Sequence, residues 1–423
     1  MNKPIRVVIL GAGDRGMHCF GKFALDNPHL MKVVGVAEPN NEKRELFAKQ
    51  HSLYGNQVFN SWEKLLGKPQ MSDALINATL DDMHYESTIQ ALDKGYQVLL
   101  EKPISNTPEK VISIAKEAER SNQLLQICYE LRYTPFFSSL KEIIDSGEIG
   151  DIVTIESKES LVYWHMAHSF VRGNWRDANE TAPMLLAKTC HDYDILTWLI
   201  QSECKFVSSF GSLNYFRKEN APPGAPDRCI DGCKYESECP YSAMKIYLNN
   251  SSGWPVSVIS VDNSLEARIE ALKNGPYGRC IFKCDNDVVD NQIVNLEFEN
   301  RVHVSFTMTG HSHENTRTIR ISGTKGTLRG HFKKGEIEIA NYNTGQIKKL
   351  KTTIPDDTHG HGGGDQRLLK DFLTAVNSGE IQHIRSGIKE SIESHLIIFA
   401  AEKARSEKQV IDFDDFKNNL RSI

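Results

Sequence analysis

The chain has 423 residues, of which 39% are hydrophobic and 25% charged, and its formal net charge is −5. One hydrophobic core rarely serves so long a chain, so we expect two domains. The lysines and arginines are scattered and no apolar run could cross a bilayer, so we expect neither a nucleic-acid partner nor a membrane partner. The sequence enters a strand pattern at once, without a signal-peptide layout, which favours a cytoplasmic location.

Strand and helix patterns alternate through residues 1–128. The continuous apolar run Ile5–Leu10 is typical of a strand buried on both faces. Further strand patterns lie at Lys32–Glu38, Ala74–Thr79, Tyr96–Lys102 and Leu124–Tyr129. This alternation predicts an α/β fold that starts with a Rossmann domain, a doubly wound parallel sheet that binds a dinucleotide.

We expect residues 129–423 to form a second α/β domain. Turns separate its strand patterns, which predicts an open, mostly antiparallel sheet with one covered face. Clear strand patterns are Ile152–Ser160, Gln292–Asn300 and Val302–Met308. A cysteine-rich loop at residues 218–242 interrupts the strands, and we expect helices towards the end of the chain, within residues 366–406.

A glycine motif of the form G-x-G-x-x-G follows the first strand. Glycines permit a tight turn there, and the helix that follows offers free N–H groups to a pyrophosphate. Glu38 ends the second strand, where an acid accepts hydrogen bonds from a ribose 2′-hydroxyl and favours NAD over NADP. Lys43 and Arg44 nearby leave NADP as the alternative. The motif residues expected at the cofactor are Gly11, Ala12, Gly13, Asp14, Arg15 and Gly16.

Glu101, Lys102 and Pro103 stand where the strand pattern Tyr96–Lys102 ends. In open α/β sheets, ligands bind at the carboxyl ends of the strands. Lys102 is therefore a candidate to hold a substrate hydroxyl near a nicotinamide and to help release its proton. The alternative is an ordinary strand end in contact with solvent.

Three stretches together resemble the Gfo/Idh/MocA oxidoreductase family: VVILGAGDRG (residues 7–16), DALINATLDDMHYESTIQALDKGYQVLLEKPIS (73–105) and GTKGTLRG (323–330). The resemblance is strong over the first 150 residues and looser beyond them. It implies a Rossmann domain, a second domain whose open sheet carries substrate and subunit contacts, and a homodimer or homotetramer. It also implies NAD(P)-dependent hydride transfer on sugars, cyclitols or their derivatives.

The resemblance implies roles for single residues as well. Lys102 corresponds to the lysine with which the family contacts its substrate. The residues implied to line the cofactor are Thr79, His84 and Glu101. Two residues of the stretch CYELRY, which leads into the second domain, are implied to lie towards the substrate: Tyr129 and Arg132.

The stretch LLAKTCHDYDIL (residues 185–196) carries a candidate base. Family members commonly have D-x-G-x-H-x-x-D here. This chain keeps the histidine as His191 and the last aspartate as Asp194, but has Ala187 in place of the first aspartate. The resemblance implies that His191 accepts the proton of the substrate hydroxyl, since an imidazole titrates near neutral pH. Lys188, beside the missing acid, is a third catalytic candidate that would contact the substrate or pair with Asp192.

The same stretch also has the pattern of a helix start. Thr189 with Asp192 three residues later resembles a capping box, which predicts that the helix begins there. His191 and Asp194 would then share one face, so Asp194 is expected to hold the imidazole in one tautomer.

Tyr163–Asp177 is dense in aromatic and basic residues. Aromatic rings stack on sugar faces while Arg and His bind hydroxyls or acids, so this segment is a candidate substrate loop. A surface loop with structural tryptophans is the alternative. Two other His-rich loops contribute His311 and His361, and Asp365 would cap the helix that follows the second. The candidates within the segment are Trp164, His168, Arg172, Trp175 and Arg176.

Cys229, Cys233 and Cys239 form C-x₃-C-x₅-C in the loop of residues 218–242. Without a secretory signal we expect reduced thiols or metal ligands rather than disulfides. A loop without apolar periodicity buries little, so a structural zinc ion is a candidate to order it. The fourth ligand would be Cys204, Cys280 or Cys284. An iron–sulfur cluster ranks below zinc, and unliganded thiols are the alternative.

These observations favour an NAD-dependent oxidoreductase that transfers a hydride between nicotinamide and a hydroxyl of a sugar, cyclitol or derivative, with Lys102 and His191 handling the proton. A first alternative is an NAD-using glycoside hydrolase, which oxidises the sugar transiently and returns the hydride. The missing acid at Ala187 keeps that alternative open. A second alternative is a non-catalytic sensor of sugars or nucleotides.

Overall fold

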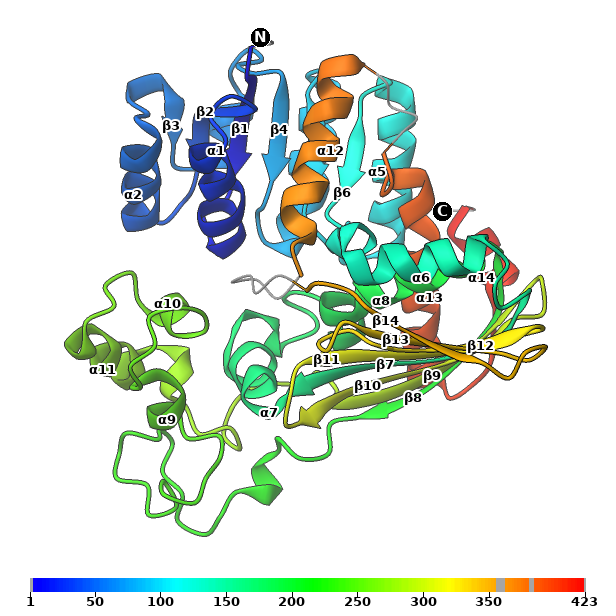
Figure 1. The fold of residues 1–423 in the computed structure, drawn as a ribbon. Helices are drawn as coiled ribbons and strands as arrows, with labels where there is room; N and C mark the ends of the chain where they lie inside the picture. The colour runs from blue at the N-terminus through cyan, green and yellow to red at the C-terminus, as the bar shows by residue number, and fades with distance from the viewer. Residues whose placement is uncertain (1–2, 355–361, 380–383, 422–423) are drawn as a thin grey trace.

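A computed structural model describes residues 3–354, 362–379 and 384–421. Two sheets dominate it (Figure 1). The first sheet is parallel throughout, and its strand order β3-β2-β1-β4-β5-β6 is that of dinucleotide-binding Rossmann domains. Its strands are β1 (Ile5–Leu10), β2 (Met31–Ala37), β3 (Val58–Phe59), β4 (Ala74–Asn77), β5 (Gln97–Leu100) and β6 (Leu125–Ile127). The prediction of a Rossmann domain is confirmed.

Short helices connect the strands of the first sheet, and polar caps fix where several of them begin. The Asn40 side chain accepts a hydrogen bond from the backbone of Lys43, and the Thr107 hydroxyl accepts one from Lys110, with Pro108 at the first helical position. The connections are η1 (Arg15–Gly21), α1 (Lys22–Asp26), α2 (Asn41–His51), η2 (Gly55–Gln57), α3 (Trp62–Leu66), η3 (Asp81–Met83), α4 (His84–Asp93) and α5 (Pro108–Ser121).

A helix from the end of the chain completes the first domain. Helix α12 (Gly364–Ser378) buries Leu368, Leu369 and Phe372 in one cluster with Val7 of β1. Its apolar side chains recur at helical spacing, so one face is available to cover the sheet. Part of the segment assigned from sequence to the second domain therefore packs against the first sheet (Figure 1).

The second sheet has the order β14-β13-β12-β11-β7-β10-β9-β8-β15. Among the described strands, only β7 and β10 pair in parallel, so the prediction of an open, mostly antiparallel sheet is confirmed. Its strands are β7 (Ile152–Val162), β8 (Cys204–Ser212), β9 (Asn291–Phe298), β10 (His303–Ser312), β11 (Thr316–Gly323), β12 (Gly326–His331), β13 (Glu336–Asn341), β14 (Ile347–Lys351) and β15 (Ile411–Asp412).

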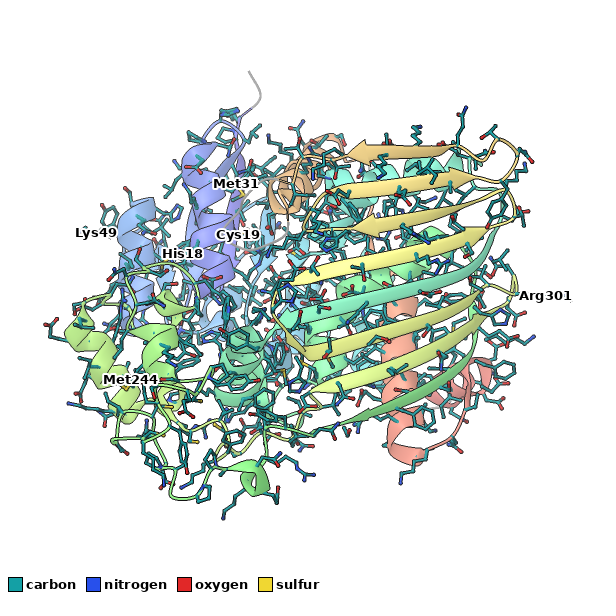
Figure 2. All side chains as sticks on the ribbon, turned by 60° about the horizontal axis from the view of Figure 1, so that its bottom comes forward. His18, Cys19, Met31, Lys49, Met244 and Arg301 are labelled. Carbon is teal, nitrogen blue, oxygen red and sulfur yellow. The ribbon has the colours of Figure 1, made fainter. Side chains whose placement is uncertain are left out.

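Helices cover one face of this sheet. Helix α13 (Ile388–Glu407) packs on α8 (Met184–Ile200) and on β8, and α6 (Pro135–Asp145) reaches β13. None of the described helices covers the opposite face, which Figure 2 shows from outside. The Phe210 side chain on that face is 70% exposed. Further elements here are η4 (Glu130–Tyr133), α7 (Tyr163–His165), η5 (Met166–Arg172), η6 (Asn174–Arg176) and α14 (Phe413–Arg421).

Residues 213–290 form a separate lobe, which lies below the first domain in Figure 1. The lobe contains η7 (Lys218–Asn220), α9 (Ala243–Tyr247), α10 (Val256–Ile259), α11 (Leu265–Asn274) and η8 (Pro276–Gly278). Its own core is small and centres on Ala243, Tyr247 and Leu272. No helix within the described residues has the length and apolarity to span a membrane.

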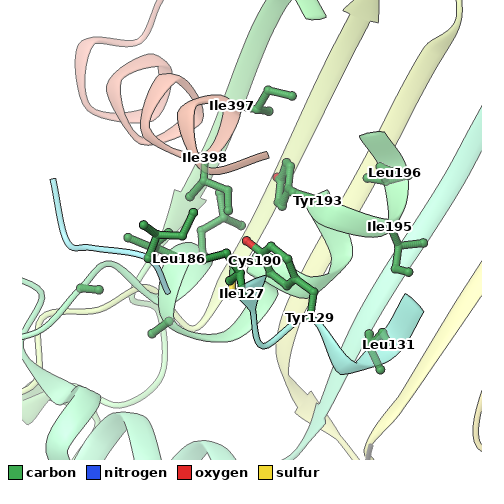
Figure 3. Close-up of a cluster of buried hydrophobic side chains, with 14 of the residues drawn as sticks. Ile127, Tyr129, Leu131, Leu186, Cys190, Tyr193, Ile195, Leu196, Ile397 and Ile398 are labelled. Carbon is green, nitrogen blue, oxygen red and sulfur yellow. The ribbon is translucent and has the colours of Figure 1, made fainter. Parts of the chain in front are cut away.

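A larger core joins the two domains. Tyr129, which follows β6, packs with Cys190 and Tyr193 of α8 and with Ile398 of α13 (Figure 3). Burial of these side chains fixes α8 beside η4, which follows β6, so the core also sets the position of the polar groups of α8.

Candidate active site

The glycine loop leaves its second glycine open to a ligand. Gly11 has a φ of 86°, and a Cβ there would lie 2.4 Å from the Ala78 carbonyl oxygen; a Cβ on Gly16 would lie 1.9 Å from that of Gly11. Both positions therefore exclude any side chain. At Gly13, nothing among the described residues lies within 4 Å of an added Cβ. The loop thus packs on its own backbone and keeps free space above Gly13.

The Glu38 carboxylate lies directly behind this loop. It accepts hydrogen bonds from the backbone N–H of Ala12 at 2.7 Å and of Asn40 at 2.8 Å. Glu38 is 7% exposed and follows β2, the position at which Rossmann domains hold a ribose hydroxyl. The open glycine and the acid together fit NAD. The Arg44 guanidinium donates to the Glu38 backbone carbonyl at 2.7 Å, so the cationic side chain expected to favour NADP lies close by.

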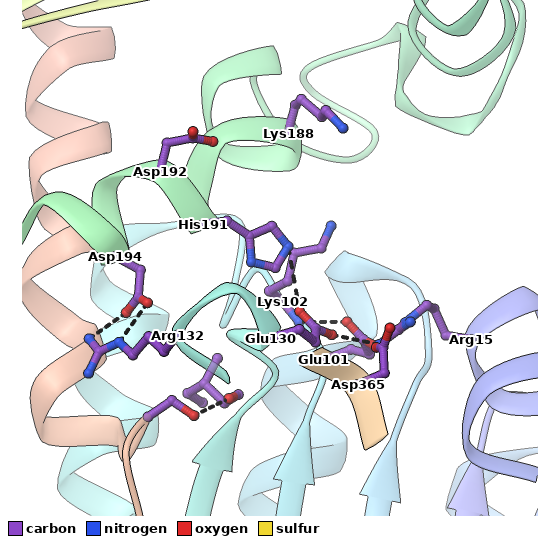
Figure 4. Close-up of polar contacts among 12 residues, drawn as sticks. Arg15, Glu101, Lys102, Glu130, Arg132, Lys188, His191, Asp192, Asp194 and Asp365 are labelled. Carbon is purple, nitrogen blue, oxygen red and sulfur yellow. Dashed lines mark hydrogen bonds and ion pairs between the residues drawn. The ribbon is translucent and has the colours of Figure 1, made fainter. Parts of the chain in front are cut away.

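Arg15 of the glycine motif turns into the protein. It forms ion pairs with Glu101 at 2.5 Å, Glu130 at 2.5 Å and Asp365 at 2.6 Å (Figure 4). Burial opposes its charge, but the three carboxylates hold the pKa of Arg15 well above its usual value. Asp365 was expected as a helix cap; α12 begins at Gly364, and the Asp365 carboxylate pairs with Arg15 instead.

Lys102 follows β5 and extends towards α8. Its ammonium donates a hydrogen bond to the Ala187 carbonyl oxygen at 3.3 Å. Burial lowers the pKa of Lys102, but Cys190, Glu101 and Asp81 raise it, and the balance is a pKa above the usual value. Burial raises the pKa of Cys190 to about 12, so this thiol stays neutral and the carboxylates supply the attraction. Lys102 is therefore a cation at neutral pH.

Ala187 contributes a backbone oxygen at the position where the resemblance implies an acid. The chain has no side-chain acceptor at this position, yet the Lys102 ammonium is still held, by the Ala187 carbonyl. Lys102 therefore stays bound to α8 although the side-chain acid is missing.

His191 faces Lys102 from the other side of the site. Its Nε2 lies 3.7 Å from an Oε of Glu130 (Figure 4). Its ring meets the Tyr129 ring edge to face, with the ring centroids 5.7 Å apart. Glu130 is fully buried, and this burial raises its pKa well above the usual range although Arg15 opposes the shift. Because Glu130 also acts electrostatically on Lys102, the acid lies next to both catalytic candidates.

Two expectations about α8 are wrong. The helix begins at Met184, after Pro183, and the Thr189 hydroxyl donates to the Leu185 carbonyl inside the helix, so Thr189 is no cap. Asp194 does not orient His191, because its carboxylate pairs with Arg132 through bonds of 2.6 and 2.7 Å. Both Arg132 and Asp194 are almost completely buried.

Lys188 pairs with Glu159 of β7 at 3.4 Å rather than with Asp192. Asp192 binds Arg317 of β11 at 2.9 Å. Burial lowers the pKa of Lys188, although Glu159 opposes the shift. Its charge acts on His165, as does that of Lys102, so the two lysines and this histidine border one region.

Three predicted substrate residues support the site. The Trp175 indole N–H donates to the Asp81 carboxylate at 3.1 Å, beside Lys102. The Trp164 ring packs on Trp254 at 5.4 Å. The buried Tyr129 hydroxyl lies 2.8 Å from Nδ1 of His395, whose Nε2 accepts from the backbone N–H of Ile104. Tyr129 therefore holds the Glu-Lys-Pro turn through His395.

The cofactor candidates Thr79 and His84 also brace this turn. The His84 ring nitrogens lie 2.7 Å from the Pro103 carbonyl oxygen and 3.1 Å from that of Thr79. His84 is fully buried. The Thr79 hydroxyl donates to Asn77 at 2.8 Å. The loops after β4 and β5 are thus fastened to each other.

The remaining candidates have partners of their own. His168 is buried against the Tyr247 hydroxyl at 2.8 Å, and burial lowers its pKa to about 3. Arg172 is buried under the cysteine-rich loop, Arg176 pairs with Asp285, and His311 pairs with Asp290 at 3.4 Å. The prediction for His361 falls outside the described residues.

Comparison with known protein families identifies the family of this chain. Residues 5–129 match the description "Oxidoreductase family, NAD-binding Rossmann fold", and residues 141–413 match "Oxidoreductase family, C-terminal alpha/beta domain", both of the Gfo/Idh/MocA group. The chain belongs to the Gfo/Idh/MocA oxidoreductase family. The resemblance drawn from three short stretches is confirmed, and so is the prediction of an oxidoreductase.

Relatives of this Gfo/Idh/MocA protein are similar at a distance. The oxidoreductase YteT of Bacillus subtilis is 24% identical over 315 residues, which are 71% of this chain and 72% of YteT. The scyllo-inositol 2-dehydrogenase (NAD(+)) of the same bacterium is 24% identical over 50% of this chain and 59% of its own. A structure of levoglucosan dehydrogenase with NADH and levoglucosan has a TM-score of 0.71 at 18% identity, covering 97% of this chain and 100% of that one. The structural likeness shows the shared fold.

Sequence reasoning missed three polar residues of this Gfo/Idh/MocA site: Glu130, Asp81 and His165. Glu130 and Asp81 are buried carboxylates that act on the charge of Lys102. His165 donates to the Asn315 side chain at 3.3 Å and faces Lys188. All three lie inside stretches already quoted, and an acid beside an otherwise apolar strand end is the signal that would have found the first two.

Proposed function

We propose that the protein is an NAD-dependent dehydrogenase that oxidises a hydroxyl of a sugar, cyclitol or derivative. One observation carries the proposal: Lys102 from the first domain and His191 from the second meet over the carboxyl ends of β5 and β6, with Glu130 next to both. Relatives named as inositol dehydrogenases support the substrate class. When bound, NAD supplies the hydride acceptor.

His191 takes the proton of the hydroxyl in this proposal. A neutral imidazole accepts it, and the Glu130 carboxyl, 3.7 Å away, lies beside the imidazolium that forms. Lys102 does not serve as the base, because its raised pKa keeps it protonated. Its ammonium instead binds the hydroxyl oxygen and stabilises the negative charge that develops there as the hydride leaves.

Lys188 and the aromatic segment bind the rest of the substrate in this proposal. The pKa of Lys188 is lowered by burial, so this lysine gains from a hydroxyl or carboxylate that satisfies its ammonium. Trp164, Trp175 and His165 offer rings and N–H groups around the same region. We further propose that the exposed sheet face around Phe210 pairs subunits into a homodimer or homotetramer.

A substrate screen tests the proposal. Purified protein with NAD is offered free sugars, cyclitols and aryl glycosides, and both NADH absorbance and release of the aglycone are followed. If the protein is a dehydrogenase, NADH accumulates when one class of polyol is added. Aglycone release without NADH would instead identify an NAD-using glycoside hydrolase, which the backbone oxygen at Ala187 keeps as the second candidate. If NAD and a sugar bind but neither NADH nor aglycone forms, the remaining candidate is the non-catalytic sensor.

Replacing Glu38 is expected to change the cofactor preference. In Glu38→Ala the acid that holds the ribose hydroxyls is lost, so the affinity for NAD should fall about tenfold while that for NADP changes little. Fluorescence titration with each cofactor measures the ratio. Glu42→Gln, which removes one exposed carboxylate on α2, is the matched control. An unchanged NAD/NADP ratio would mean that Glu38 does not contact the ribose.

Replacing His191 is expected to slow the chemical step. His191→Asn keeps a polar side chain but cannot carry the proton, so kcat should fall about a hundredfold with the NAD affinity preserved. Steady-state kinetics and NAD titration measure the two quantities. His29→Asn, at an exposed position, controls for the loss of an imidazole. Full activity of His191→Asn would assign the proton to another group.

A further inference from the structure

Four cysteines from two distant segments line one cavity in the lobe of residues 213–290. Cys229, Cys233 and Cys239 come from the loop, and Cys280 comes from the segment after η8. A short backbone bridge joins Arg228 to Arg279 and brings the segments together. The Cys229 N–H donates to the Gly278 carbonyl at 2.9 Å, and the Cys280 N–H to that of Asp227 at 2.8 Å.

Few regular elements and little apolar burial stabilise the loop that carries these cysteines. Between η7 and α9 the described chain consists of turns and this one bridge. The nearby lobe core is small, as described above. Ordering a segment of this length costs conformational entropy that such burial scarcely offsets. A bound group that links several of its side chains would supply the missing stabilisation.

Arg172 supplies an independent sign that the cavity holds an anionic group. Its side chain is completely buried, and one terminal nitrogen lies 3.6 Å from the Cys229 sulfur. The other terminal nitrogen, Nη1, has no hydrogen-bond partner among the described residues, and no carboxylate among them pairs with Arg172. A buried guanidinium without a counter-charge is costly. Thiolates bound to a metal would provide that charge.

The spacing of the sulfurs separates the candidate groups. Among the described residues, no three of these cysteine sulfurs lie within 4.8 Å of one another. Thiolates that share one zinc ion stand about 3.8 Å apart, given a Zn–S bond of about 2.3 Å and tetrahedral geometry. Thiolates around a four-iron core stand farther apart, because the iron and sulfide atoms lie between them. The cavity that these cysteines help to line has a volume of about 40 Å³, more than the roughly 10–15 Å³ that a single water needs.

The positions of the other candidate cysteines indicate which one is the fourth ligand. Cys204 lies in β8, within the main core, and the Cys284 thiol donates to the Cys280 carbonyl at 3.3 Å. Cys280 is thus the fourth ligand.

We propose that Cys229, Cys233, Cys239 and Cys280 bind a [4Fe–4S] cluster. The cluster takes the place of the structural zinc ion expected from the three loop cysteines. Arg172 donates to its sulfur atoms and also to the Tyr241 and Arg279 carbonyls at 2.8 Å, so it links the cluster to η5. The cluster therefore fixes the segment that starts at His165, beside Lys188. Its role in this proposal is structural support of the substrate side.

Metal and sulfide analysis of the full-length protein tests the proposal. Protein purified without oxygen should contain about four irons and four acid-labile sulfides per chain, with the broad visible absorbance of an iron–sulfur cluster that bleaches on dithionite reduction. Cys239→Ala and Cys280→Ala should each lose most of the iron and the absorbance. Cys284→Ala, which changes a neighbouring thiol outside the cavity lining, should keep both.

Two results would overturn the assignment. One zinc per chain without iron would show a mononuclear thiolate site, and a folded protein free of iron, sulfide and zinc would show four unliganded thiols. Because these readouts use the unaltered protein, they hold even where an alanine variant fails to fold, and none of them depends on finding the substrate.

Discussion

Lys102→Met is expected to lower kcat a few hundredfold while NAD still binds. The methionine keeps the length of the side chain but removes the ammonium that Ala187 holds over the strand ends. A charge aimed at the oxygen where negative charge develops is worth about 3–4 kcal/mol in a water-poor site. The raised pKa of Lys102 means that this charge is present throughout the neutral range.

The measurement is a comparison of kcat, KM and NAD affinity with the unaltered enzyme on the substrate found by the screen. Lys102→Arg serves as the conservative variant: it keeps the charge, and partial recovery would attribute the loss to electrostatics rather than to packing. Lys94→Met, which removes a surface lysine before β5, controls for the change in net charge. Near-normal turnover in Lys102→Met would exclude Lys102 from the chemistry.

The buried ion pair of Arg132 with Asp194 is expected to contribute strongly to the stability of the fold. Asp194→Asn should destabilise the protein by about 3–5 kcal/mol, because it leaves the Arg132 guanidinium buried without its counter-charge. Chemical unfolding followed by circular dichroism measures the loss. Asp145→Asn breaks the Lys141–Asp145 pair, whose acid is 52% exposed, and should cost under about 1 kcal/mol.

A double variant distinguishes this explanation from a catalytic role. Replacing both partners, Arg132→Met with Asp194→Leu, removes both charges and should recover much of the stability lost by Asp194→Asn. If Asp194 instead oriented His191, Asp194→Asn would keep its stability and lose activity. The ion pair with Arg132 argues for the first outcome.

The first domain could be predicted from sequence apart from the two-residue strand β3 and helix α12, which was assigned to the second domain. Its strands are short apolar runs buried on both faces, and the glycine motif follows the first of them, so local pattern and fold agree. The alternating burial of β9 and β10 likewise follows from their alternating polar residues. Elements with a clear period and a local motif were therefore the ones predicted correctly.

Helix α8 shows why parts of the second domain were harder to predict from sequence. It is buried on nearly all sides, so its apolar residues lack the one-sided period by which a helix is recognised. The polar residues within it then looked like a start signal, and the N-cap was predicted six residues late, at Thr189 instead of Pro183. The partner of Asp194 was missed for another reason: Arg132 lies 62 positions earlier, and no local rule relates them.

The ion pairs of Arg15 have a consequence for how this protein is made. One of its three acids, Asp365, lies 350 positions further along the chain, on the helix that covers β1. A ribosome delivers the glycine loop first and α12 near the end. The dinucleotide site therefore cannot reach its final form while the chain is still growing through the second sheet. A product cut short before Gly364 would carry the whole glycine motif, yet its first core would be open to water and its Arg15 would lack one of its three acids.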